Sequence, residues 1–171
     1  MTNFKHIKFE KQGAIARLQL NRPDAANGLD ALMANELNQA AQICSNDPEL
    51  KVVLLCASGR FFCAGGDIKE MLSHGDAIGD AVKSLADDLH SAISTFSRMQ
   101  AALIVAVNGV AAGAGFSLAL IGDIVLAAES ASFTMAYTRA GLCPDGGSSY
   151  FLPRLVGLRR AQELMLTNRT L

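Results

Sequence analysis

Three glycine-rich turns in this chain each stand directly before a segment with the pattern of a helix. They cover residues Phe61–Asp67, Asn108–Gly115 and Gly141–Ser148. Glycine lets the backbone approach a ligand closely, and the first N–H groups of a helix have no partner inside it. Two such turns that converge could direct two N–H groups at one oxygen atom and stabilise negative charge on it. A single turn is more often only a tight connection, and none of the three matches the nucleotide-phosphate loop GxGxxG.

Asp145 lies in the third turn and is the candidate acid–base residue of the chain. It follows Pro144 and precedes Gly146 and Gly147, which allow a sharp exit. A carboxylate held beside a substrate carbon can remove a proton from it. The alternative is structural, because aspartate is also a preferred N-cap and a helix is predicted directly afterwards. His90 is the second candidate; it stands at the border of the apolar side of a long predicted helix, where a surface or packing role is the alternative.

Composition excludes several classes of function. The 171 residues are 50% hydrophobic and 18% charged with a net charge of −1, so we expect a globular protein without a basic face for nucleic acid. Three histidines occur and none stands at ligand spacing from a cysteine, so no metal site is predicted. The longest apolar run is too short to span a bilayer, and the polar opening segment, residues 1–8, lacks a signal-peptide pattern. No two cysteines have CxxC spacing, and Cys44 and Cys56, which stand in apolar segments, are expected to be buried free thiols. Free thiols and the lack of a signal-peptide pattern predict a cytoplasmic protein.

Strand-like and helix-like segments alternate along the chain, which predicts an α/β fold around a mostly parallel sheet. Period-two segments at 7–10 and 14–20 predict a hairpin, and Asp30 and Asp67 stand at N-cap positions before helices. Continuous apolar runs predict strands that are buried on both faces. Those strands are 52–56, 103–107 and 123–128, and the principal helices are 30–45, 78–99, 113–121 and one that begins near 158.

Four motifs together resemble the enoyl-CoA hydratase/isomerase family, which has the crotonase fold. They are Leu20–Pro23 with Ala26–Asn27, Phe62–Ile68, Asn108–Gly115 and Gly141–Gly147, and the resemblance covers nearly the whole chain. It implies a spiral of ββα repeats, which differs from a simple doubly wound sheet. It also implies an acyl-CoA thioester as substrate, with coenzyme A present only as part of that substrate, and assembly into homotrimers or hexamers.

The resemblance assigns roles to individual residues. In this family two backbone N–H groups polarise the thioester carbonyl and stabilise an enolate, and by position they belong here to Gly66 and Ala114. Alanine at 114 is compatible with this role because the donor is main chain. Contacts with coenzyme A, made largely through the backbone, are implied for Ala25, Ala26, Ala64, Asp67 and Ile68.

The two glutamates that activate water in family hydratases would align with Ser117 and Tyr137, and neither of these substrate-site residues can serve as a carboxylate base. Asp145 is similar to the aspartate of isomerases that act on 3-enoyl-CoA or ring-1,2-epoxyphenylacetyl-CoA, so isomerisation with Asp145 as proton shuttle is the favoured function. It is also similar to the aspartate of 4-chlorobenzoyl-CoA dehalogenase, in which a histidine at a spacing like that of His90 activates water. Hydration and non-catalytic acyl-CoA binding are the remaining alternatives.

Residues 1–171 are predicted to form one crotonase-like acyl-CoA-binding domain, with no linker or low-complexity tract. The sequence stops one turn past a predicted helix, whereas family members continue into a C-terminal helical part that helps to close the pocket. Leu164 and Leu166 would then leave an apolar face uncovered, so a C-terminal part is expected to be missing.

Overall fold

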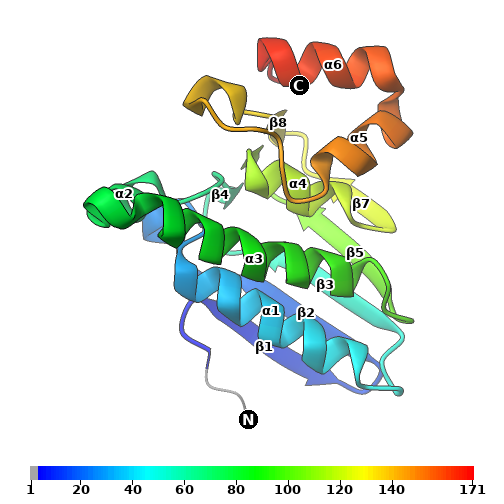
Figure 1. Cartoon of the computed structure of the whole chain (residues 1–171). Helices are drawn as coiled ribbons and strands as arrows, with labels where there is room; N and C mark the ends of the chain where they lie inside the picture. Colours follow the sequence, from blue (N-terminus) through cyan, green and yellow to red (C-terminus); the bar gives the residue numbers. More distant parts are fainter. Residues whose placement is uncertain (1–3) are drawn as a thin grey trace.

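The structure is a computed structural model that describes residues 4–171. The prediction of no signal peptide rests in part on residues 1–3, which lie outside the described residues. Pairs of strands alternate with helices as four successive ββα units (Figure 1). The units are β1 (Ile7–Gln12), β2 (Ile15–Leu20) and α1 (Ala31–Ser45); β3 (Val52–Ala57), β4 (Phe61–Cys63), α2 (Ile68–Ser73) and α3 (Ile78–Phe96); β5 (Ala102–Val107), β6 (Val110–Ala112) and α4 (Ala114–Leu120); and β7 (Ile124–Ala127), β8 (Ser132–Thr134), α5 (Ser148–Val156) and α6 (Leu158–Thr167).

The strands form two sheets. The larger has the order β1-β2-β3-β5-β7, in which β1 and β2 are antiparallel and every later neighbour is parallel. The smaller sheet is parallel and has the order β4-β6-β8. In the second, third and fourth units the chain therefore leaves the large sheet, adds one strand to the small sheet and continues into a helix. The α/β class and the spiral of ββα repeats are confirmed.

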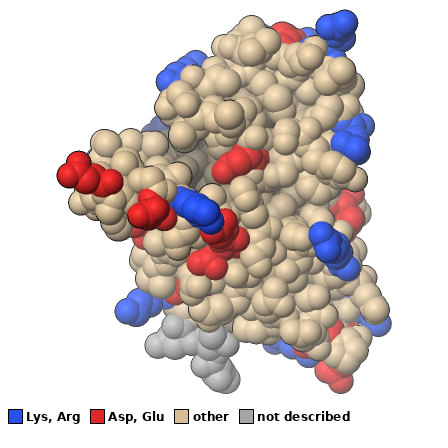
Figure 2. All heavy atoms as spheres, in the orientation of Figure 1, with Lys and Arg blue, Asp and Glu red and all other residues tan. Residues whose placement is uncertain are grey.

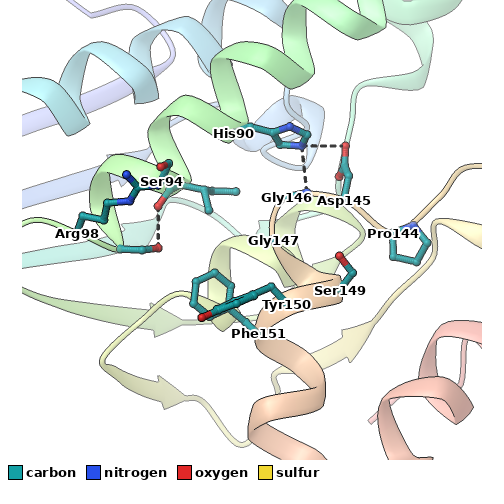
Figure 3. A pocket seen from close by; sticks show the side chains of 12 residues that line it. His90, Ser94, Arg98, Pro144, Asp145, Gly146, Gly147, Ser149, Tyr150 and Phe151 are labelled. Carbon is teal, nitrogen blue, oxygen red and sulfur yellow. Dashed lines mark hydrogen bonds and ion pairs between the residues drawn. The ribbon is translucent and has the colours of Figure 1, made fainter. Parts of the chain in front are cut away.

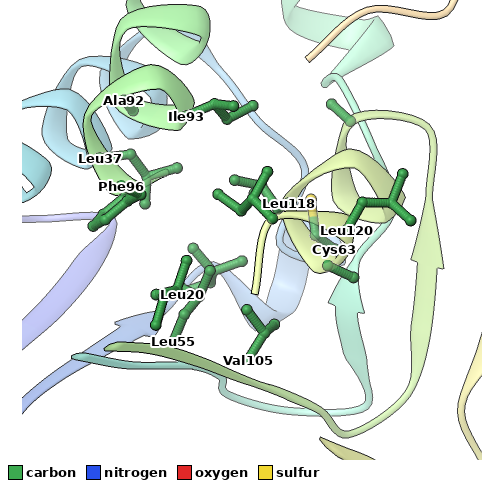
Figure 4. Close-up of a cluster of buried hydrophobic side chains, with 14 of the residues drawn as sticks. Leu20, Leu37, Leu55, Cys63, Ala92, Ile93, Phe96, Val105, Leu118 and Leu120 are labelled. Atoms are coloured by element: carbon green, nitrogen blue, oxygen red, sulfur yellow. The ribbon is translucent and has the colours of Figure 1, made fainter. Parts of the chain in front are cut away.

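The core lies between the large sheet and the helices that cover it. Helices α1 and α3 lie side by side on one face of this sheet (Figure 1). Alternate residues of the strands point to that face, as the period of two in a strand requires. Burying one such leucine or phenylalanine side chain stabilises the fold by about 1.5–3 kcal/mol. The buried set includes Leu20, Leu55 and Val105 from the strands and Leu37, Phe96 and Leu118 from the helices (Figure 4).

Local sequence signals place several helix starts correctly. The Asp30 carboxylate accepts a hydrogen bond from Met33 N at 2.8 Å and caps α1. The Asp67 carboxylate accepts from Lys69 N at 3.1 Å and Glu70 N at 3.2 Å and caps α2. Both predicted caps are confirmed, and the predicted hairpin and long helix occur with ends shifted by a few residues.

The prediction that residues 123–128 form a buried strand is wrong. In β7 the side chains of Ile124, Val125 and Leu126 are 53%, 43% and 59% exposed. The strand is at the edge of the large sheet, where it pairs only with β5. A continuous apolar run gives no information about whether a neighbour covers it, so periodicity could not distinguish this edge from a central strand.

Two further expectations about exposure are corrected. Leu164 is buried, and only Leu166 of the predicted apolar pair is exposed. Cys56, expected to be buried like Cys44, is only partly buried. All four cysteines are unpaired, as expected.

Two features of the described residues relate to binding of nucleic acid and to membranes: the surface charge and the character of the helices. On the face of the described residues drawn in Figure 2, acidic and basic side chains occur in small groups, and no broad basic patch is seen. Of the helices within residues 4–171, none combines the length and the apolar character needed to cross a membrane.

Candidate functional site

The first two glycine-rich turns lie against each other. The turn after β4 leads through Gly65 to Gly66, and the turn after β6 leads through Gly113 into α4. A Cβ atom on Gly115 would overlap the carbonyl oxygen of Cys63, so only glycine permits this approach. Gly65 and Gly113 have φ angles of 102° and 53°, which are also unfavourable for other residues. The glycines therefore bring the segment that carries Gly66 beside the start of α4.

Gly66 N–H and Ala114 N–H both remain available at this junction. Their neighbours are engaged, since Asp67 N donates to Leu29 O and Gly113 N donates to Thr134 O. Among residues 4–171, neither Gly66 N nor Ala114 N has a hydrogen-bond acceptor, and Ala114 is the first residue of α4, where no intrahelical acceptor exists. Both residues line one cavity of about 200 Å³. Two free backbone donors at one cavity can bind a single oxygen atom of a ligand.

The remaining wall of this cavity is mainly apolar. It comes from α2, from α3 and from the segment between β8 and α5. Figure 2 shows the surface hollowed between the end that carries α2 and the part that carries α4. An apolar wall with a few polar groups is typical of small-molecule sites. Its apolar side chains include Ile68, Met71, Leu85, Leu89 and Leu142.

Asp145 lines this cavity and also a second, more open cavity of about 800 Å³ beside α3 and α5. Its Oδ1 atom is buried without a hydrogen-bond partner among the described residues, and its Oδ2 atom lies 3.4 Å from His90 Nε2. The capping alternative is wrong, because α5 begins at Ser148 with Gly147 at the N-cap position and has no side-chain cap. The carboxylate is therefore free to face a ligand.

The backbone of Asp145, unlike its side chain, is fixed by several hydrogen bonds. Its carbonyl oxygen accepts hydrogen bonds from Ser117 Oγ at 3.1 Å, Ser148 Oγ at 2.7 Å and Ser148 N at 2.9 Å. On the other side of the same peptide bond, Gly146 N donates to His90 Nε2 at 3.2 Å (Figure 3). The sequence gives no sign of this role for Ser148, because serine beside glycine is an ordinary turn composition.

Ser117 and Tyr137 lie together although they are twenty residues apart, with their hydroxyl oxygens 2.8 Å from each other. Both side chains are buried, but only Tyr137 lines the smaller cavity, whereas Ser117 lies behind it. Burial, followed by the negative charge of Asp145, raises the pKa of the Tyr137 phenol well above its usual value. The Ser117–Tyr137 pair is therefore uncharged. In hydratases of the family that the sequence resembles, two glutamates are expected at these positions.

The residues expected to contact coenzyme A form one surface beside the cavity. Ala64 N donates to Ala26 O at 3.1 Å, so the two segments that carry these residues run next to each other. Ala64 and Ile68 also line the smaller cavity, while Ala25 is exposed at the start of the neighbouring loop. The structure thus brings together residues that lie up to 43 positions apart in the sequence (25 and 68).

Arg22, which belongs to the Leu20–Pro23 motif, organises this surface through ion pairs that the sequence does not predict. Its Nη2 atom lies 3.0 Å from Asp67 Oδ2 and 3.2 Å from Asp30 Oδ2. Burial alone would raise the pKa of Asp67, but the hydrogen bonds from Glu70 N–H and Arg22 outweigh it and lower that pKa. The ion pair ties the loop after β2 to the residue that follows Gly66. No local pattern indicates this contact, since Arg22 and Asp67 are far apart in the sequence.

The chain is similar in sequence to known proteins. A family model described as enoyl-CoA hydratase/isomerase matches residues 10–171. A 1,2-epoxyphenylacetyl-CoA isomerase from Escherichia coli (strain K12) is 38% identical over 160 residues, which are 92% of this chain and 60% of that protein. The 4-chlorobenzoyl coenzyme A dehalogenase-2 of an Arthrobacter species is 32% identical over 167 residues, which are 97% of this chain and 60% of that protein.

The fold is also similar to that of solved structures. The crystal structure of an enoyl-CoA hydratase from Bacillus anthracis superposes with a TM-score of 0.90 at 30% identity, over 98% of this chain and 64% of that chain. This chain therefore spans less than two thirds of the length of each of these three relatives. On the family match and on these similarities in sequence and fold, the chain belongs to the enoyl-CoA hydratase/isomerase family.

Proposed function

We propose that this protein isomerises an enoyl-CoA thioester, moving a 3,4 double bond to the 2,3 position, with Asp145 as the proton shuttle. One observation carries the proposal: within residues 4–171, the Asp145 Oδ1 atom and the backbone N–H groups of Gly66 and Ala114 have no hydrogen-bond partner, and all three residues line the same small cavity. The coenzyme A portion of the substrate would lie along Ala25, Ala26 and Ala64. No permanently bound cofactor is required, because the reaction only moves a proton and a double bond.

In this mechanism the thioester oxygen accepts hydrogen bonds from Gly66 N–H and Ala114 N–H. The Asp145 carboxylate removes a proton from the carbon next to the thioester carbonyl, and the electron pair becomes part of a dienolate whose charge rests on that oxygen. The protonated Asp145 then returns the proton to the carbon at the far end of the dienolate. Each N–H donor contributes about 10²–10³ in rate in comparable oxyanion sites.

Three features support this proposal. Ser117 and Tyr137 supply no carboxylate to activate water, and the pKa of Tyr137 is raised, so the phenol does not act as an anionic base near neutral pH. The wall of the cavity is mostly apolar, which suits an acyl chain. A relative of 38% identity is named an isomerase of an acyl-CoA.

The test is to incubate the full chain with 3-enoyl-CoA and follow products by mass-resolved chromatography. We expect a product of unchanged mass, absent in Asp145→Asn, while coenzyme A binding measured by calorimetry is kept. Asp76→Asn, at an exposed aspartate away from both cavities, is the matched control and should remain active. Unchanged turnover by Asp145→Asn would sink the proposed role, and a product heavier by one water would favour hydration.

Dehalogenation is the second candidate, and the 3.4 Å contact between His90 Nε2 and Asp145 Oδ2 favours it. In that reaction Asp145 would attack an aromatic ring carbon, chloride would leave, and water would release the product. Chloride release from 4-chlorobenzoyl-CoA would establish this activity. Coenzyme A binding without turnover of any of these substrates would favour a non-catalytic binding protein.

Assembly into homotrimers or hexamers and a cytoplasmic location are further parts of the proposal. The exposed apolar residues of β7 supply a surface that a second copy of the chain could cover. Light scattering gives the mass in solution, and a monomer at micromolar concentration would contradict the assembly.

A further inference from the structure

His90 Nε2 lies between two neighbours that need opposite proton states. Gly146 N–H, at 3.2 Å, requires a nitrogen that carries no proton. Asp145 Oδ2, at 3.4 Å, would accept a hydrogen bond only from a nitrogen that carries one. One ring nitrogen cannot accept from Gly146 and donate to Asp145 at the same time.

The hydrogen bond from Gly146 N–H to His90 Nε2 is favoured over a hydrogen bond from His90 Nε2 to Asp145. Gly146 is buried, and its N–H has no other acceptor among residues 4–171, so losing His90 would leave a buried donor unpaired. Asp145, in contrast, lines the more open cavity with a side chain that is 38% exposed, so water can solvate its carboxylate there. The shorter contact and the buried donor both favour an imidazole that is neutral, with its proton on Nδ1.

The surroundings of Gly146 explain why the segment needs this bond. Gly146 and Gly147 both have positive φ angles, of 56° and 74°, so the chain here has few conformational restraints of its own. At the other end of the same peptide unit, Ser117 from α4 and Ser148 from α5 hold the Asp145 carbonyl oxygen. His90, on α3, supplies the restraint on the nitrogen side (Figure 3).

His90 is also separated from the place where substrate would react. It lines the larger cavity and is not among the described residues that line the smaller cavity with Gly66 and Ala114. Asp145 lines both and stands between them. A residue that acts directly on the substrate would have to reach the smaller cavity.

We infer that His90 is a positioning residue: its neutral imidazole accepts the Gly146 N–H, fixes the Asp145–Gly146 peptide unit and leaves the Asp145 carboxylate without a hydrogen bond from the imidazole. The inference rests on the proposed role of Asp145. It differs from the role of a histidine that activates water, because the Nε2 lone pair is already used.

Two variants test this role through activity. His90→Gln places an amide oxygen within reach of Gly146 N–H, whereas His90→Leu keeps the bulk and removes the acceptor. We expect kcat of His90→Gln to stay within about threefold of the original protein and kcat of His90→Leu to fall by about 10- to 100-fold, the range for a misplaced reacting group, with KM unchanged. Equal losses in the two variants would overturn the inference, since glutamine rescues a hydrogen bond and does not rescue proton transfer.

A second measurement needs no substrate. Long-range ¹H–¹⁵N spectra of uniformly ¹⁵N-labelled protein show which ring nitrogen carries the proton, and the signals that disappear in His90→Gln identify His90 among the three histidines. We expect the proton on Nδ1 at neutral pH, and a large shift of the Gly146 amide signal in His90→Leu but not in His90→Gln. A proton on Nε2 would overturn the inference. If Asp145→Asn stays active, the proposed function fails, but the position of the proton on His90 is still measured independently.

Discussion

The hydroxyl groups of Ser117 and Tyr137 lie 2.8 Å apart, and the Ser117 oxygen is also 3.1 Å from the carbonyl oxygen of Asp145. A carbonyl only accepts, so serine must give its single proton to make that bond. Tyr137 is then the donor to Ser117, and the chain of hydrogen bonds ends on the backbone of Asp145. Ser117 and Tyr137, which carry no carboxylate, thus help to fix the backbone of Asp145, which carries one.

The Tyr137 hydroxyl should make the free energy of unfolding decrease at alkaline pH. Because burial and the charge of Asp145 raise the pKa of this phenol in the folded state, the unfolded chain ionises first as pH rises past about 10. The stability from this residue is complete below that pH and is lost as pH rises further toward the folded-state pKa. We expect the free energy of unfolding, measured by urea titration from pH 8 to 11, to fall less steeply in Tyr137→Phe than in the original protein.

Tyr150→Phe, at the other, exposed tyrosine, is the control and should not change this slope. Burial also raises the pKa of Cys44 to about 11 and that of Cys63 to about 12, but these thiols are present in every variant compared. At neutral pH, Tyr137→Phe should cost about 0.5–1.5 kcal/mol for one lost hydrogen bond. Parallel pH slopes for Tyr137→Phe and the original protein would contradict the prediction.

Ala114→Pro should remove one of the two proposed oxyanion donors and keep the fold. Ala114 is the first residue of α4, where proline is tolerated because the N–H makes no intrahelical bond. We expect kcat for 3-enoyl-CoA to fall by about 10²–10³, the usual cost of one such donor, with little change in the melting temperature. Ala114→Gly keeps the N–H and should remain active. Full activity in Ala114→Pro would show that this N–H takes no part in the reaction.

Gly115→Ala should separate the two turns that form the site. A Cβ atom there would overlap the Cys63 carbonyl oxygen, and backbone has to move to relieve the overlap. We expect a loss of about 1–3 kcal/mol in the free energy of unfolding, typical of overpacking, together with a loss of activity. Gly79→Ala on α3 is the matched control; its Cβ meets nothing within 4 Å, so it should stabilise the helix by up to about 1 kcal/mol. Equal stability of the two variants would contradict the proposed close packing.

Asp67→Asn should lower the free energy of unfolding at neutral pH and lower it less in acid. The pKa of the Asp67 carboxyl is lowered in the folded state, so its contribution is present above about pH 4, the ordinary value, and is lost as pH falls through the folded-state pKa. Asparagine can still cap α2 but forms no ion pair with Arg22. We expect a loss of about 1–2 kcal/mol at pH 7 that shrinks below pH 4, measured by urea titration at each pH. Asp24→Asn, exposed on the same loop, should have no such effect.

Local features of this protein could be predicted from the sequence alone because each depends on residues a few positions apart. The Asp30 and Asp67 caps involve only the next two or three residues, and the hairpin and helices follow from hydrophobic periodicity. The glycine turns before Gly66 and Ala114 follow from residue type as well, and the motifs that carry them identify the family.

The tertiary structure decided what lies next to these local features. Asp145 could be a cap or a free carboxylate on sequence grounds, and only the start of α5 at Ser148 with its N-cap at Gly147 leaves the side chain free. The exposure of β7 depends on whether anything covers the sheet edge, which the apolar run itself does not indicate. The Arg22–Asp67 ion pair and the bond from Gly146 to His90 join residues 45 and 56 positions apart. Such contacts are set by how the helices and sheets pack, so no pattern within one segment could predict them.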